Sequence, residues 1–223
     1  MLAAGNPPPA TAGHTGHQPR TTQGELPVSR WLRRGAAALL LIAVVTAAAA
    51  WLMLRGSLPT LDGELALAGL SATVTVQRDG LGVVSIDAGN EADAMRALGY
   101  VHAQERYFEM DLMRRSAAGE LAALFGARAI PRDRRVRVHR MRARAQAGLD
   151  AILGDQRGVA QAYVEGVNAG LAALPVRPWP YLLLRARPEP WQLSDIAMVS
   201  DAMFFDLRMR PTSANWRGGA CGR

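Results

Sequence analysis

A long apolar run near the N-terminus dominates the hydrophobic pattern of the chain. Residues 35–54, GAAALLLIAVVTAAAAWLML, carry no charge, and Thr46 is their only hydrophilic side chain. At 1.5 Å per residue, a helix of this length measures about 30 Å, which matches the hydrocarbon core of a bilayer. The pattern therefore predicts a transmembrane helix over residues 35–54.

Charged residues on either side give this helix a direction. Arginines precede it at four positions, Arg20, Arg30, Arg33 and Arg34, whereas Arg55 on the far side is followed by Asp62 and Glu64. Because basic flanks tend to stay in the cytoplasm, we expect a single-pass protein of the cytoplasmic (inner) membrane. Its C-terminal region would be exported to the periplasmic or extracellular side. Residues 1–34 are turn-rich and aperiodic, which predicts a disordered cytoplasmic tail.

A buried core helix and a cleaved signal peptide are the alternatives for this segment. The alanines at 47–50 resemble the small residues of a cleavage site. The apolar run nevertheless continues through Leu54, and this continuity favours an uncleaved anchor.

The pattern changes after residue 56. Residues 72–77 alternate small or apolar with polar side chains, and a turn sequence covers 78–82. Residues 83–86, Val-Val-Ser-Ile, form a second strand pattern, so a β-hairpin is predicted. A long helix is expected to begin at Asn90, with Asp93 as its capping-box partner, and no proline interrupts it before Ile130.

Further helices are predicted downstream of this long helix. A short one over 119–125 would end at Gly126, a longer one would cover 145–173 with Gly166 marking close packing, and the last would run from an N-cap at Ser194 to about Leu207. A proline-rich connector covers residues 175–190. The expected class is α+β and mainly helical.

Charge argues against a nucleic-acid partner. The chain has no lysine, so all of its positive charge comes from arginine. The net charge of +7 is concentrated at the two ends of the chain. Residues 56–206 hold 17 arginines against 18 acids, so the main region is neutral. The single cysteine, Cys221, cannot form an intramolecular disulfide.

One helical stretch contains candidate metal ligands. His102, Glu105 and Glu109 are spaced three and four apart and could face one another on a helix. One helix supplies too few ligands, and neighbouring arginines are available to pair with the acids. We therefore predict no metal site, and we expect the basic run over 132–144 to form a solvated face or internal ion pairs.

Several short motifs, in a fixed order, resemble the penicillin acylase (penicillin amidase) family over about residues 73–206. They include GYVHAQER at 99–106, GELA at 119–122, GVNA at 166–169 and a Pro-Trp pair at 190–191. The residues that carry the resemblance most clearly are Arg78, Asp79, Tyr100, His102, Gln104, Arg106, Arg114, Arg115, Gly119, Asn168, Trp191 and Asp195.

The resemblance implies a fold and a reaction. Family members are N-terminal nucleophile hydrolases with an αββα sandwich, whose precursor cuts itself into an α and a β chain. The new N-terminal serine of the β chain attacks a linear amide, and its own α-amine accepts the proton. This sequence resembles the α chain, so the twelve motif residues would be scaffold, no catalytic residue is expected here, and the chain alone is expected to be inactive.

The resemblance also implies ligands and partners. Part of the acyl-pocket wall would come from Met198, Met203, Phe204 and Phe205. No cofactor is evident; calcium binds many family members, but the chain has no acid after Asp206 to serve as the expected ligand. The expected partners are a β chain of the same precursor, the membrane through residues 35–54, and an amide such as an acylated β-lactam, homoserine lactone or lipopeptide.

The last residues depart from the family pattern. Residues 207–223 are basic, glycine-rich and free of acids, which suggests a truncated or frameshifted terminus. The stretch Ser-Ala-Asn-Trp at 213–216 resembles the start of a family β chain, but the asparagine is shifted by one position and only a few residues follow. A non-catalytic fragment or pseudoenzyme that kept the scaffold as a binding module is therefore the alternative interpretation.

Overall fold

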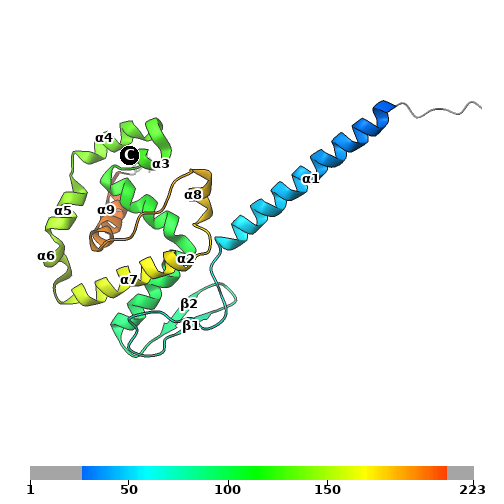
Figure 1. Cartoon of the computed structure of the whole chain (residues 1–223). Coiled ribbons are helices and arrows are strands. Elements are labelled where there is room, and N and C mark those ends of the chain that lie inside the picture. Colours follow the sequence, from blue (N-terminus) through cyan, green and yellow to red (C-terminus); the bar gives the residue numbers. More distant parts are fainter. Residues whose placement is uncertain (1–26, 210–223) are drawn as a thin grey trace, which may run out of the picture. The chain divides into compact units, whose positions relative to one another are not determined.

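The computed structural model describes residues 27–209, without the side chains of residues 27–29, 205, 206, 208 and 209. Most of the predicted N-terminal tail and the atypical C-terminal residues from 210 onward lie outside this range. The chain divides into two compact units, residues 1–47 and 48–223. The described chain is mainly helical with one small sheet (Figure 1).

The first helix is longer than the sequence pattern predicted. Helix α1 covers Pro27–Gly56, so residues 27–34, which we expected to be disordered, are helical. Arg30–Gly56 is long and apolar enough to cross a membrane, and its most apolar window is not buried in the protein. A signal sequence near an N-terminus would satisfy the same criterion.

The predicted hairpin is present. Strands β1 (Thr75–Arg78) and β2 (Val84–Asp87) pair antiparallel, with Thr75 opposite Asp87. The carboxylate of Asp79 closes the turn by accepting hydrogen bonds from the backbone N–H groups of Leu81 and Val83, at 2.9 and 2.8 Å. Asp79 therefore fixes the end of the hairpin through local backbone bonds.

Helix α2 (Glu91–Ala118) begins at the predicted N-cap. The Asn90 side chain accepts a hydrogen bond from the backbone N–H of Asp93. The expected capping box is incomplete, because the Asp93 carboxylate accepts hydrogen bonds from the Asn90 side chain and from the backbone and hydroxyl of Ser71 instead. The helix ends at Gly119, which has a left-handed conformation with φ 69°.

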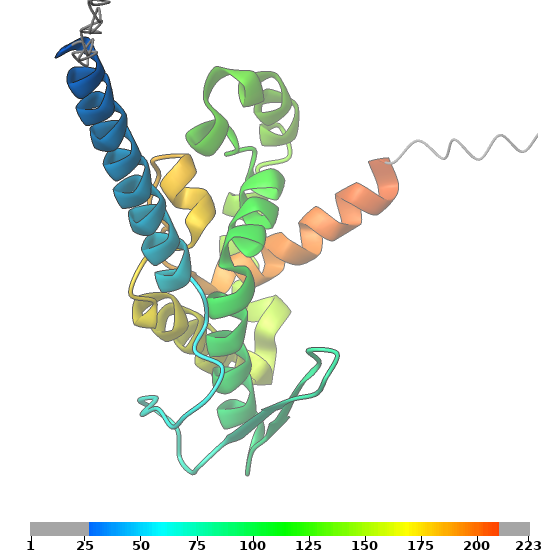
Figure 2. The same ribbon diagram turned by 90° about the vertical axis from the view of Figure 1, so that its right-hand side faces the viewer.

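The remaining helices surround α2 (Figures 1 and 2). They are α3 (Ala122–Phe125), η1 (Gly126–Ala129), α4 (Ile130–Arg137), α5 (Met141–Ala147), α6 (Leu149–Leu153), η2 (Gly154–Gln156), α7 (Arg157–Ala173), α8 (Trp179–Leu183) and α9 (Leu193–Met209). The single helix expected over 145–173 is broken at Gly148 and Gly154, where the backbone leaves the helical conformation. Helix α9 begins at Leu193, so Ser194 lies inside it and is not the N-cap.

The backbones of helices α2 and α7 approach each other closely where they cross, because a glycine of each helix faces the backbone of the other. A β-carbon on Gly99 would meet the carbonyl of Tyr163, and one on Gly166 would meet the carbonyl of Arg96. The prediction that Gly166 marks close packing is confirmed. The core beside this crossing contains Ala103, Tyr107, Val164, Val167, Tyr181 and Trp191.

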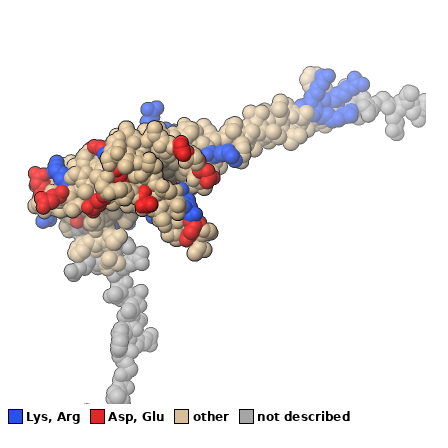
Figure 3. All heavy atoms as spheres, turned by 90° about the horizontal axis from the view of Figure 1, so that it is seen from below, with Lys and Arg blue, Asp and Glu red and all other residues tan. Residues whose placement is uncertain are grey.

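Surface charge on the second unit is mixed. Figure 3 shows acidic and basic side chains interspersed on the face in view, with a separate group of basic side chains at the start of α1. This distribution agrees with the neutral composition of residues 56–206.

Candidate functional site

A buried aspartate lies at the centre of the polar interior. The Asp111 side chain is fully buried on α2 and accepts hydrogen bonds from the Nε atoms of Arg114 at 2.7 Å and Arg115 at 2.9 Å. The hydroxyl of Tyr181 on α8 donates to its second oxygen at 2.6 Å. Two guanidinium groups and a phenol therefore compensate the cost of burying this carboxylate.

A second buried aspartate joins three helices. Asp195, at the start of α9, accepts hydrogen bonds from Arg114 of α2 at 2.6 Å and from Arg142 of α5 at 3.1 Å. Its carboxylate also accepts the backbone N–H of Gln192 at 2.9 Å. Arg142 in turn forms two hydrogen bonds with Glu120, so the loop after α2 belongs to the same network.

The chain between α8 and α9 is clamped by side chains of α2 and α7. Arg114 donates to the carbonyls of Glu189 at 2.9 Å and Pro190 at 3.0 Å, and its guanidinium lies 5.0 Å from the centre of the Trp191 ring. Asn168 binds the backbone of Trp191 on both sides, accepting from its N–H at 2.8 Å and donating to its carbonyl at 3.0 Å. The start of α9 is thereby fixed relative to the α2–α7 pair.

Electrostatics make this network a structural element. Burial raises the pKa of the Tyr107 and Tyr181 hydroxyls, so both stay protonated and act as donors. Burial alone would lower the pKa of Arg114, but Tyr107, Asp111 and Asp195 more than offset this effect and raise it. Because the pKa of each of these three groups is raised, none of them gains or loses a proton near neutral pH.

A second polar group lies on the N-terminal half of α2. The Nδ1 atom of His102 is 3.0 Å from the Tyr163 hydroxyl, and the two rings pack edge to face. Burial, with a smaller contribution from Arg106, lowers the pKa of His102, and burial raises the pKa of Tyr163 to about 12. His102 is therefore a neutral packing residue at physiological pH.

Glu105, one of the two acids that could have joined His102 in a metal site, pairs with arginine. Glu105 pairs with Arg78 of the hairpin and lies 3.9 Å from Arg106, whose backbone is non-helical and kinks α2. Among the described residues 27–209, no group of three or more histidines, cysteines or carboxylates has the spacing of a metal site.

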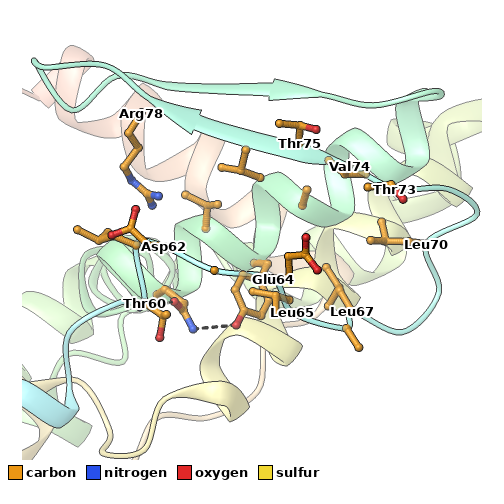
Figure 4. A pocket seen from close by; sticks show the side chains of 18 of the residues that line it. Thr60, Asp62, Glu64, Leu65, Leu67, Leu70, Thr73, Val74, Thr75 and Arg78 are labelled. Carbon is orange, nitrogen blue, oxygen red and sulfur yellow. Dashed lines mark hydrogen bonds between the residues drawn. The ribbon is translucent and has the colours of Figure 1, made fainter.

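A pocket of about 770 Å³ lies between α2 and the segment that precedes the hairpin. Figure 4 shows leucine and valine side chains around it, with Asp62, Glu64 and Arg78 at its polar margin. Tyr100 and Gln104 form its floor on α2, where the Gln104 side chain accepts from the backbone N–H of Thr60 at 3.3 Å and donates to the Tyr100 hydroxyl at 3.1 Å.

The predicted acyl-pocket residues divide into two environments on α9. Met198 is fully buried and packs with Ala117 and Ala145. Met203 and Phe204 are about half exposed, on the C-terminal half of α9 that projects from the other helices (Figure 2). The side chain of Phe205 lies outside the described part of the structure.

Comparison with known proteins identifies the family of this chain. A sequence model of the family described as penicillin amidase matches residues 73–219. The chain belongs to the penicillin amidase family. The match begins within the residues that precede β1 and continues beyond position 206, where the recognisable motifs end.

Individual members of the penicillin amidase family show the same relationship. The chain is 48% identical over 139 residues to the penicillin acylase 2 proenzyme of a Pseudomonas species, covering 62% of this chain and 18% of that protein. It is 34% identical over 179 residues to the acyl-homoserine lactone acylase QuiP of Pseudomonas aeruginosa, covering 78% and 21%. The chain thus spans about a fifth of the length of these relatives.

A solved structure of the family has the same fold. The thermostable penicillin G acylase from Alcaligenes faecalis aligns with a TM-score of 0.53 and 30% identity, over 60% of this chain and 73% of that chain. The mainly helical fold with its hairpin therefore matches part of a penicillin acylase.

The structure brings part of the family-motif set together. Five of its members, Arg114, Arg115, Asn168, Trp191 and Asp195, meet in the buried network. Tyr100 and Gln104 line the pocket, and His102 packs on α7. Arg78 and Asp79 belong to the hairpin, Arg106 forms the kink, and Gly119 ends α2.

Sequence reasoning missed several members of the network. Tyr107, Asp111, Arg142 and Tyr181 were not singled out, and Glu120 entered only as part of the GELA motif. Asp111 had a usable signal, because it precedes Arg114 and Arg115 by three and four residues, the spacing of ion pairs on one helix face. Tyr181 and Arg142 had none, since only the tertiary fold brings them to α2 and α9.

Proposed function

We propose that this chain is the N-terminal, α-chain-like part of a penicillin-acylase-type amidohydrolase that hydrolyses linear amides. The nucleophile would be the N-terminal serine of a β chain that lies outside these 223 residues. Membership of the penicillin amidase family carries this proposal, and the coverage of about a fifth of each relative supports a partial role.

The chemistry assigned to the β chain defines what this chain has to supply. A serine at a chain terminus can attack an amide carbonyl while its own α-amine accepts the hydroxyl proton. Such a centre needs a rigid support, because small displacements of a nucleophile are costly to the rate. The Asp111 and Asp195 networks would provide this support within an αββα sandwich completed by the β chain.

The exposed half of α9 is our candidate for the acyl side of the site. Met203 and Phe204 present apolar surface that would suit an aliphatic or aryl acyl group. Met198 is buried in the core, so its role would be to hold α9 in place. Phe205 stays in the proposal through its sequence position alone. The substrate would be an acylated β-lactam, an acylated homoserine lactone or a lipopeptide.

Anchoring in the inner membrane is a separate proposal. The length and apolar composition of Arg30–Gly56 and the arginines at its N-terminal side support a single span with the rest of the chain exported. A cleaved signal sequence is the competing interpretation, and the mass of the N-terminal peptide from membrane-bound protein distinguishes the two.

A non-catalytic scaffold is the second candidate function. It is favoured by the pairing of the buried ionisable groups with one another, which suits a rigid support. Under this interpretation the chain would bind a partner and not complete an enzyme.

A chimera tests the leading proposal. The matching segment of the Pseudomonas penicillin acylase 2 proenzyme would be replaced by residues 73–206 of this chain. We expect the chimera to cut itself into two chains and to release a carboxylic acid from an acyl amide. A soluble, folded chimera that cuts itself but releases no acid would favour the scaffold interpretation.

A further inference from the structure

The short helix α8 has two contrasting sides. Its central residue, Tyr181, is fully buried and donates a hydrogen bond to Asp111, so α8 is pinned to the core. On its other side, Trp179 is 49% exposed and Leu183 is 74% exposed. A rigidly held element thus presents two large apolar side chains, four residues apart, to its surroundings.

The start of α8 lies close to the end of α1. The backbone N–H of Val176 donates to the carbonyl of Gly56 at 3.1 Å, and a β-carbon on Gly56 would lie 2.7 Å from the Val176 side chain. Gly56 and Val176 both belong to the second compact unit. Since three residues span at most about 11 Å, Trp179 lies within that distance of Val176, the residue that contacts the end of the apolar helix.

This distance matters if α1 spans a membrane. The polar headgroup region adds about 5–8 Å to each side of the hydrocarbon core, so an element that closely follows a contact with the end of a span can reach the headgroups. Tryptophan is enriched at this depth because its ring is apolar and its N–H is polar. Trp51 near the end of α1, with Arg55 5.3 Å from its ring, has the same character.

Charge around α8 suits the same environment. The stretch from Leu174 to Arg187 contains three arginines, Arg177, Arg185 and Arg187, and no acid. Arg185 and Arg187 are exposed. Guanidinium groups bind the phosphate oxygens of phospholipid headgroups with paired hydrogen bonds.

We propose that α8 is an interfacial element that rests in the lipid headgroup layer, with Trp179 and Leu183 inserted and the neighbouring arginines on phospholipid phosphates. The inference rests on the proposed anchoring of α1 in a membrane. It would hold the acylase-like domain against the bilayer in one orientation, so that an amide substrate with a long acyl chain could be taken from the lipid phase.

Spin labels on single cysteines test this directly. The full-length chain with Cys221→Ser would carry one added cysteine, from Leu183→Cys, Val45→Cys or Leu81→Cys, and would be reconstituted in phosphatidylethanolamine–phosphatidylglycerol vesicles. Val45 reports on the span itself, and Leu81, which is 90% exposed at the hairpin turn, is the matched apolar control. Collision of the label with oxygen and with a water-soluble nickel chelate is measured.

The proposal predicts a lipid-like label at Leu183. Oxygen collisions should exceed those at Leu81, and nickel collisions should be at least about threefold lower, because a polar chelate is excluded from the apolar boundary. A Leu183 label that resembles Leu81, while Val45 is in lipid, would overturn the inference and leave the anchor intact. Low collision with both reagents at Leu183 would show a protein cover and would also overturn it.

A label at Val45 that is accessible to the nickel chelate would show that α1 does not span. That outcome would refute the anchor and, with it, the position of α8. The proposed amidohydrolase role would be untouched, since the chimera measures it independently.

Discussion

At the scale of single residues, burial of charge is the main feature of this chain. Asp111 and Asp195 are fully buried, and each accepts a hydrogen bond from a residue at least 70 positions away, Tyr181 for Asp111 and Arg114 for Asp195. Arg114 and Asp195 are 81 positions apart, so no local pattern could have paired them. The family motifs included Arg114, Arg115 and Asp195 among twelve residues, but the contacts that these three make became visible only in the folded chain.

Loss of the Asp111 charge should be costly. Asp111→Asn keeps the shape of the side chain but leaves two buried guanidinium groups without their carboxylate, so the free energy of unfolding should fall by about 3–5 kcal/mol. Urea unfolding followed by circular dichroism measures the change. Asp150→Asn is the matched control, because Asp150 pairs with Arg157 at an exposed position. An equally small change in the free energy of unfolding for both variants would contradict the role of Asp111 as a buried counter-charge.

His102 should make stability dependent on pH. Its folded-state pKa is below the ordinary value of 6.5 because burial and Arg106 disfavour the charged ring. The unfolded chain therefore takes up a proton first, and stability is lost as the pH falls below 6.5 until the folded-state pKa is reached. His102→Gln should reduce the difference in urea midpoint between about pH 7.5 and about pH 5. An unchanged difference would exclude His102 as its source.

At the scale of elements, local signals predicted the hairpin and the start of α2 but missed the breaks before α7. The hairpin and the start of α2 at Asn90 follow from alternation and capping, which depend on neighbouring residues. The break between α5 and α7 was missed, because Gly148 and Gly154 lie in a sequence whose apolar spacing continues through them. Glycine can be tolerated in a helix or can end it, and tertiary packing decides between these outcomes.

The crossing of α2 and α7 gives a sharp prediction about glycine. Gly166→Ala should destabilise the chain by about 1–3 kcal/mol, because the added methyl group meets the backbone of α2. Gly158→Ala, on the same helix with no atom near its β-carbon position, should stabilise it by up to about 1 kcal/mol through helix propensity. Thermal unfolding of the two variants measures both, and changes of the same sign would contradict the crossing geometry.

The exposed end of α9 predicts an effect on acyl preference. In the chimera with the penicillin acylase 2 proenzyme, Met203→Asp should lower kcat/KM for a phenylacetyl or fatty-acyl amide by about tenfold or more, since a charge would face the apolar group. Hydrolysis of an acetyl amide should change much less. Equal losses for both substrates would show that Met203 does not contact the acyl group.

At the scale of the whole molecule, family membership and the partial span of the chain belong together. The ordered motifs were enough to recognise the penicillin amidase family, since many short matches in sequence order are specific even when each is weak. They could not give the depth of each side chain: residues 198 and 203 are both methionine, yet Met198 is in the core and Met203 is at the surface. Helical phase relative to the neighbouring helices sets this difference, and that phase depends on the full packing.

The central claim is that this chain supplies the support for an amidohydrolase but not its nucleophile. The most direct measurement is release of carboxylic acid from a phenylacetyl amide and from a fatty-acyl homoserine lactone by the purified chain, alone and mixed with a separately produced family β chain. The account predicts no release by the chain alone and release when the β chain is present. Hydrolysis by the chain alone would contradict it.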